Sequence, residues 1–222
     1  MKNLSIVVLV LAVTVLACKW PGSVKESPSG GTAGESSSPS KDSSTGGSDP
    51  KADVVQASRK FLALPYFTAN MEGVGQTDIK SKVAYAAPDR FHVKYTGGTG
   101  QGMEMISIGN DMYMNANGKW SKMPSSGTSM PNLRDSFTEE GLKSLTEVKF
   151  EGEDTLDGQS ALTYSYKNVT PVGNYPFTSK IWVGKEDGVP KKLYVEYSNG
   201  TLKNMTIRYD TETPVTIEPP IK

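Results

Sequence analysis

Methionine is the side chain whose number and spacing point most directly to chemistry in this sequence. Six of the nine methionines fall within 28 residues, namely Met103, Met105, Met112, Met114, Met123 and Met130. Thioethers are soft and flexible, so such a cluster has three interpretations: ordinary core packing, an adaptable wall for an apolar ligand, or ligands for reduced copper. Copper is the least favoured, because alternation on a strand produces Met-x-Met by itself. Core and adaptable wall both stay open, and we expect no metal and no cofactor.

Strand alternation makes a sharper prediction about four of these methionines. Side chains on a strand alternate between the two faces of the sheet. If the turn around Gly109 contains two residues, the odd-numbered positions before the turn and the even-numbered positions after it lie on the same face. Four methionines would then share one face, with Ile106, Ile108 and Tyr113 on the other. We expect this face to be concave and apolar, and to contain Met103, Met105, Met112 and Met114 together with at least some of Phe91, Val93, Tyr95, Tyr164, Tyr166 and Trp182.

Other chemistry finds little support in the sequence. The single histidine, His92, alternates with apolar residues on an expected strand and has no nucleophile motif near it. The carboxylates gather in expected helix starts and hairpins, where solvated charge is the norm, and the glycine-rich run 97–102 lacks the ending of a phosphate loop. With 24 Lys and Arg against 24 Asp and Glu, there is no basic excess for nucleic acid. We therefore expect a protein that is not an enzyme.

The only cysteine, Cys18, points to a lipid anchor. A positive start at Lys2 precedes an apolar run that is too short to span a membrane and ends at the cysteine. The tetrapeptide 15–18 (VLAC) resembles the bacterial lipobox, which implies cleavage after residue 17 and lipidation of Cys18. The alternative is a plain secretory peptide. Lys19 is not the Asp that favours inner-membrane retention, so in a bacterium with two membranes we expect the outer one, with the domain in the periplasm or outside.

The chain divides into three parts by composition. Residues 1–17 are the expected signal peptide, and residues 18–50 are the anchor and a Ser/Gly/Pro-rich linker that cannot bury enough apolar surface to fold. Residues 51–222 form one domain of ordinary size. It begins with a helix that Ser48 or Asp49 caps and Pro65 ends. A second, short helix is expected at 138–145, after Thr138.

The rest of the domain alternates with a period of two, which predicts strands with one solvated face. Turn residues such as 115–118 (NANG) and 157–158 (DG) separate them. The pattern predicts an α+β fold that is mostly β: a large, curved antiparallel sheet of about nine to eleven strands, with two or three helices on one face.

Several segments resemble, in order, the bacterial lipoprotein-localisation carriers of the LolA/LolB superfamily, which includes mycobacterial lipid-carrying lipoproteins. They are 53–73, with Phe61-Leu62 and the strand 66–71 (YFTANM); 88–91 (PDRF); the hairpin 105–120 (MISIGNDMYMNANGKW); and 186–190 (EDGVP) with the alternating Leu193, Val195 and Tyr197. The resemblance implies an unclosed barrel whose helices cover an apolar cavity that accepts acyl chains. The carriers' latch arginine, directly before the proline of PDRF, is Ala87 here.

Two functions follow as hypotheses. One is a membrane-tethered carrier that binds acyl chains of a lipid or a lipoprotein. The other is an envelope sensor or scaffold that binds a partner protein through its sheet, with the cavity filled by side chains. In the first case the loop 124–136 would act with the helices as a cover, and Met130 and Leu133 would close the mouth; the plain alternative is an ordinary surface loop.

Overall fold

The computed structural model describes residues 49–124, 134–169, 176–198 and 200–221. The expected signal peptide, Cys18, the linker up to residue 48 and the two lid candidates Met130 and Leu133 lie outside the described residues, whereas Asp49 and Pro50, expected at the end of the linker, begin α1. In chain order the described elements are α1 (Pro50–Leu62), β1 (Tyr66–Gly75), β2 (Ile79–Ala86), β3 (Arg90–Gly98), β4 (Glu104–Ile108), β5 (Asp111–Ala116), β6 (Lys119–Met123), the 3₁₀ turn η1 (Asp135–Phe137), α2 (Glu139–Lys143), β7 (Thr146–Leu156), β8 (Gln159–Val169), β9 (Pro176–Gly184), β10 (Pro190–Tyr197) and β11 (Leu202–Asp210).

Both predicted helices are present, and both begin where a capping side chain was expected. The Asp49 carboxylate accepts a hydrogen bond from the backbone N–H of Ala52 at 3.0 Å, and Pro50 occupies the first turn, where no N–H is needed. The Thr138 hydroxyl accepts one from the N–H of Gly141 at 3.2 Å and starts α2. Each helix buries one apolar face, which is what holds such short helices in place.

The strands form one antiparallel sheet in the order β6-β5-β4-β3-β2-β1-β11-β10-β9-β8-β7. In the described part of the chain this makes eleven strands with β6 and β7 as the edges, so the barrel is unclosed, as predicted. The β4–β5 turn has two residues, because Ile108 pairs with Asp111. The β7–β8 turn has Asp157 and Gly158 at φ of 52° and 84°, the left-handed conformation that such two-residue turns require.

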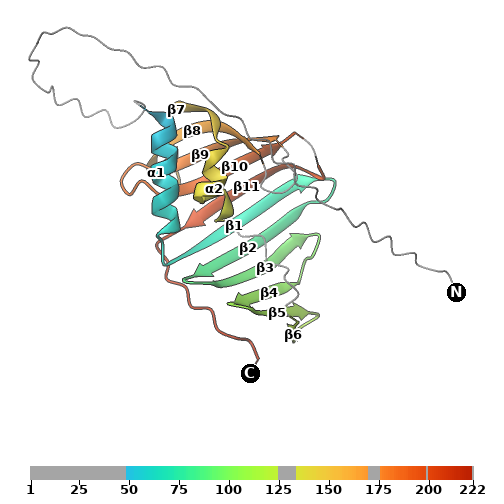
Figure 1. Cartoon of the computed structure of the whole chain (residues 1–222). Helices are drawn as coiled ribbons and strands as arrows, with labels where there is room; N and C mark the ends of the chain where they lie inside the picture. Colours follow the sequence, from blue (N-terminus) through green and yellow to red (C-terminus); the bar gives the residue numbers. More distant parts are fainter. Residues whose placement is uncertain (1–48, 125–133, 170–175, 199, 222) are drawn as a thin grey trace, which may run out of the picture. The chain divides into compact units, whose positions relative to one another are not determined.

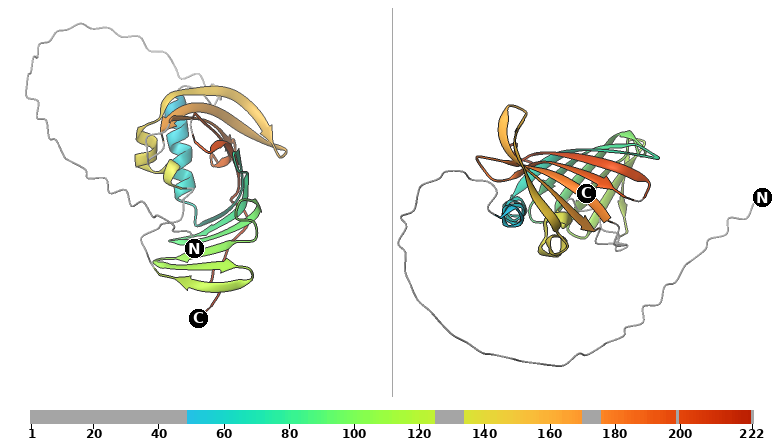
Figure 2. Two further views of the ribbon diagram at one scale, coloured as in Figure 1. Left: turned by 90° about the vertical axis from the view of Figure 1, so that its right-hand side faces the viewer. Right: turned by 90° about the horizontal axis from the view of Figure 1, so that it is seen from above.

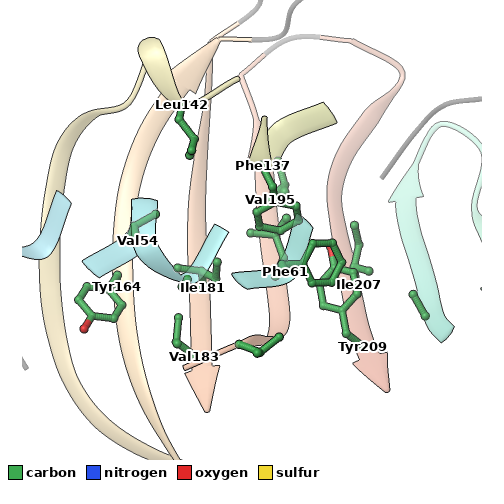
Figure 3. Packing of buried hydrophobic residues seen from close by; sticks show 14 of the residues in the cluster. Val54, Phe61, Phe137, Leu142, Tyr164, Ile181, Val183, Val195, Ile207 and Tyr209 are labelled. Atoms are coloured by element: carbon green, nitrogen blue, oxygen red, sulfur yellow. The ribbon is translucent and has the colours of Figure 1, made fainter. Parts of the chain in front are cut away.

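The helices cover one half of the sheet. In Figures 1 and 2, α1 and α2 lie over the half that contains β7 to β11, and none of the described helices lies over β3 to β6. The largest buried cluster fills the space between α1, η1, α2 and this half (Figure 3). None of the helices in the described ranges is long and apolar enough to cross a membrane.

Candidate functional site

Strand alternation gives the sheet an inner face, towards the helices, and an outer face. Directly paired residues of neighbouring strands point to the same side. Tyr209, Ala69 and Val83 are paired in a row and all belong to the buried cluster under α1, so this row marks the inner face. The row continues across the uncovered half of the sheet through Val93, Met105 and Met114.

Under the helices, the inner face is closed by aromatic packing. The Phe61 ring of α1 lies 4.9 Å from the Phe67 ring, 4.6 Å from the Phe137 ring and 4.8 Å from the Tyr209 ring, measured between centroids. Phe61 and Phe67 are completely buried. Figure 3 shows Phe61, Phe137 and Tyr209 meeting between α1 and the sheet. The space that the family resemblance assigns to a ligand is therefore occupied here by side chains.

A second inner-face surface, which we call the methionine face, lies beyond the helices on β3 to β6. One row pairs Val93, Met105 and Met114, and the next pairs Phe91 with Ser107, Met112 and Met123. Tyr95 and Met103 adjoin at the end of the surface, where the Tyr95 N–H donates to the Met103 carbonyl at 2.9 Å. The apolar members of the methionine face are Phe91, Val93, Tyr95, Met103, Met105, Met112, Met114 and Met123, all half-buried.

The methionines of this face belong to neither buried cluster of the domain. Phe91 and Val93 touch the edge of the main cluster, whereas Met103, Met105, Met112, Met114 and Met123 pack against neither the main cluster nor the smaller one on the outer face. Of the three interpretations of the methionine cluster, ordinary core packing therefore fits least well. Two interpretations remain, an adaptable apolar wall and a site for a soft metal ion, and both need thioethers that are accessible at the surface.

The predicted shared face is found for the four methionines together with Phe91, Val93 and Tyr95. Tyr164 and Tyr166 also point inward, but they lie under the helices on β8, away from the methionine face. The Tyr164 hydroxyl donates to Asp53 of α1 at 3.0 Å, and burial raises the pKa of Tyr166 to about 12. Both residues therefore act in the packing of the covered half.

The prediction for Trp182 is wrong, because its side chain lies on the outer face. It pairs with Thr163 and Lys192, whereas its neighbour Ile181 is completely buried on the inner face. The indole N–H donates to the Asp154 carboxylate at 2.8 Å, which lowers the pKa of that carboxyl, and the Lys192 amine lies 4.1 Å from the ring centroid. The apolar run of residues 181–183 has no alternation from which its facing could be read.

The Arg134 side chain contacts two elements that are distant in the sequence, and nothing in the sequence indicated these contacts. Its guanidinium donates to the Tyr85 hydroxyl and to the Leu62 carbonyl, and lies 4.3 Å from the centroid of the Tyr85 ring. One side chain thus joins the segment before η1 to the end of α1 and to β2. The last carbonyls of α1 have no helical N–H to accept from, and the Arg134 guanidinium donates to one of them, that of Leu62.

The outer face of β3 to β6 is covered by the chain's own C-terminal segment. Ile217 is buried with Ile106 and Tyr113, and Val215 and Trp120 pack around them. Arg90 of β3 donates to the Ile217 carbonyl at 2.5 Å. The uncovered half of the sheet is thus closed on its outer side by residues 213–221, while its inner side carries the methionine face.

Charged groups lie on the outer face and at the sheet ends. Glu104 of β4 is 2.8 Å from the Lys94 amine and 3.7 Å from His92, and the hydrogen bond from Lys94 lowers the pKa of Glu104.

A polar cavity of about 290 Å³ at the β7–β8 turn is lined by Asp157, Lys191, Arg208 and neighbouring residues. Its lining is too charged for an acyl chain. Within the described residues, no group of three His, Cys, Asp or Glu side chains could hold a metal ion.

Comparison with known proteins adds evidence on the fold. No protein-family model matches the sequence, and no curated protein matches it. Among solved structures, LprF of Mycobacterium bovis matches with a TM-score of 0.59 and 14% identity over 80% of this chain and 100% of that one. The lipoprotein LppX of Mycobacterium tuberculosis matches with a TM-score of 0.55 and 14% identity over 76% of this chain and 98% of that one. The chain therefore shares the fold of these two mycobacterial lipoproteins, an unclosed antiparallel sheet with helices on one face, as its sequence predicts.

Proposed function

We propose that this protein is a membrane-tethered bacterial lipoprotein that binds the acyl chains of a lipid or lipoprotein and takes part in their transport within the cell envelope. The methionine face carries the proposal. It is an apolar surface of mostly flexible side chains on the inner side of the sheet, and its five methionines pack against neither buried cluster. Thioether side chains adapt to ligands of irregular shape, which suits chains of differing length and branching.

The position of this surface favours binding over β3 to β6 rather than under α1. Binding under α1 would require displacing Phe61 and Phe137 from their ring contacts, whereas the methionine face is already half-accessible. The acyl chain would lie across the paired rows that contain Met105 and Met112. The function is thus a binding one rather than an enzymatic one, with lipid as the partner of the inner face.

The anchor completes the proposal. A lipid on Cys18 and the linker up to residue 50 would hold the domain near its membrane, the outer one in a bacterium that has two. A coil of that length spans on the order of 30 Å, so the domain could reach lipids without leaving the surface. Met130 and Leu133, on the segment that leads to Arg134, remain our candidates for a cover of the methionine face.

The experiment is lipid extraction from purified protein that carries Cys18→Ser, followed by mass spectrometry, with a titration of a fluorescent fatty acid alongside. We expect co-purified acyl lipid and saturable binding. Met114→Asp places a charge on the methionine face and should weaken the titration at least tenfold. Lys82→Asp, which adds a carboxylate to the outer face of β2, is the matched control and should leave it unchanged. Absence of both lipid and saturable binding would refute the proposal.

A second candidate is a sensor or scaffold that binds a partner protein through its sheet. The observation in its favour is the closed aromatic packing under α1, because a domain that only presents a surface needs no cavity. The same lipid measurement separates the two functions. A partner-binding module would purify without acyl lipid and would show no saturable uptake of a fatty acid.

A further inference from the structure

The paired register of the methionine face brings several sulfur atoms within reach of one another. Met105 of β4 directly faces Met114 of β5, and Met112 of β5 directly faces Met123 of β6. Facing side chains on a sheet have Cβ atoms about 4.5–5.5 Å apart, and diagonal neighbours lie about 7–8 Å apart. A methionine side chain is long and unbranched. The thioethers of Met105, Met112 and Met114 can therefore converge on one point between β4 and β5.

The side chains around that point decide which ion would fit it. The same-face neighbours of these methionines in the two rows are Ser107, Ser121 and Val93, none of which is a carboxylate or an imidazole. The nearby His92 of β3 and Glu104 of β4 lie on the outer face, where their side chains are 3.7 Å apart. Thioethers alone are soft ligands, which discriminate against Zn²⁺ and Mg²⁺ and select Cu(I) and its analogue Ag(I).

We propose that Met105, Met112 and Met114 form a binding site for a soft monovalent metal ion, Cu(I) or Ag(I). Neutral thioethers leave the single positive charge of the ion uncompensated, which a fully buried site would penalise heavily. The methionine face is half-buried, so solvent still screens the charge. The rigid paired strands below the methionines hold their backbones in place before the ion arrives, which lowers the entropy cost of binding.

This site stands independently of the proposed lipid function, although both use the same surface. Leucine separates the two chemistries because it keeps the apolar volume of methionine and removes the sulfur. The chain also offers a matched control in Met71 and Met205. Both lie on the inner face, but they pack against the main buried cluster, on β1 and β11.

The test is a titration of the mature chain that carries Cys18→Ser, which removes the thiol as an alternative ligand. Cu(I) is added under anaerobic conditions against bicinchoninate as a competing chelator, and Ag(I) binding is measured by calorimetry. We expect one ion per chain. The triple variant Met105→Leu/Met112→Leu/Met114→Leu should bind at least tenfold more weakly, a loss of about 1.4 kcal/mol. The double variant Met71→Leu/Met205→Leu should bind as the parent does.

The proposal is overturned by a parent chain that takes no Cu(I) from the chelator, by a triple variant that binds as tightly as the parent, or by a double control variant that loses as much as the triple variant. A His92→Ala chain that loses binding would also overturn the proposal, because it would move the site to the outer face. Circular dichroism and urea unfolding confirm that each variant is folded. If the triple variant loses Cu(I) but keeps fatty-acid uptake, the metal site is supported and the lipid function is unaffected.

Discussion

Ile217 should be the residue through which the C-terminal segment stabilises the uncovered half of the sheet. Its side chain is only 4% exposed and is buried with Ile106 and Tyr113 on the outer face. Ile217→Ala removes the side chain beyond Cβ, at about 0.8 kcal/mol for each buried methylene-sized group, so we expect a loss of about 2 to 3 kcal/mol. The lower end is favoured because the segment lies at the surface and can close part of the space.

The loss should be local, and hydrogen exchange is the assay that shows this. Without Ile217 the C-terminal segment keeps only its weaker contacts, and β4 to β6 lose the cover on their outer side. Mass spectrometry of exchanged peptides should show lower protection in β3 to β6 and little change in β8 to β10, which pack under α1. Urea unfolding gives the accompanying change in the free energy of unfolding.

Ile221→Ala is the control, because this isoleucine is 37% exposed in the same segment. Exposed substitutions of this kind usually change the free energy of unfolding by less than about 0.5 kcal/mol. Equal losses of unfolding free energy for the two substitutions would show that burial of Ile217 does not stabilise the sheet. The local effect is refuted if Ile217→Ala lowers protection in β8 to β10 as much as in β3 to β6, because Ile217 would then belong to the main cluster.

Two further predictions concern polar contacts. Arg134→Ala should cost about 1.5 to 3 kcal/mol in urea unfolding, because it removes charged hydrogen bonds to Leu62 and Tyr85; Arg134→Lys should recover only part of this, since one amine cannot replace the planar fork, and full recovery would contradict the assigned geometry. Lys94→Met should destabilise the domain at pH 7 by less than about 1 kcal/mol through loss of the ion pair with Glu104. The pKa of Glu104 is lowered in the folded state, so its contribution is present above the ordinary value of 4.5 and is lost as the pH falls through the folded pKa. The penalty of Lys94→Met should therefore vanish near pH 2, and a constant penalty would show that the pair contributes nothing.

The elements and the facing of most strands could be predicted because both depend on local patterns. Alternation around a two-residue turn places Met105 and Met114 on one face whatever the rest of the domain does, and the structure pairs them directly. The capping residues Asp49 and Thr138 are equally local signals. Such features need only the chain within a few residues of them.

The features that could not be predicted depend on contacts between distant parts of the chain. Arg134 is an ordinary loop arginine in the sequence, and its role exists only because the fold brings Leu62 and Tyr85 to it. Ile217 stands in a proline-containing tail where only Val215 and Ile217 alternate, which is too short a pattern to indicate that Ile217 is buried against β4 and β5. Trp182 follows Ile181 in an unbroken apolar run, and only the strand register decides its side.

A photo-cross-linking map would locate the bound acyl chain on the sheet. A fatty acid that carries a diazirine near its methyl end is bound to the Cys18→Ser chain and irradiated, and the modified peptides are sequenced by mass spectrometry. We expect labels to concentrate on β3 to β6, at Met105, Met112, Met114 and their inner-face neighbours, and excess unlabelled fatty acid to compete them away. Labels on the outer face around Trp182, or labels spread evenly and unaffected by competitor, would contradict acyl-chain binding at the methionine face.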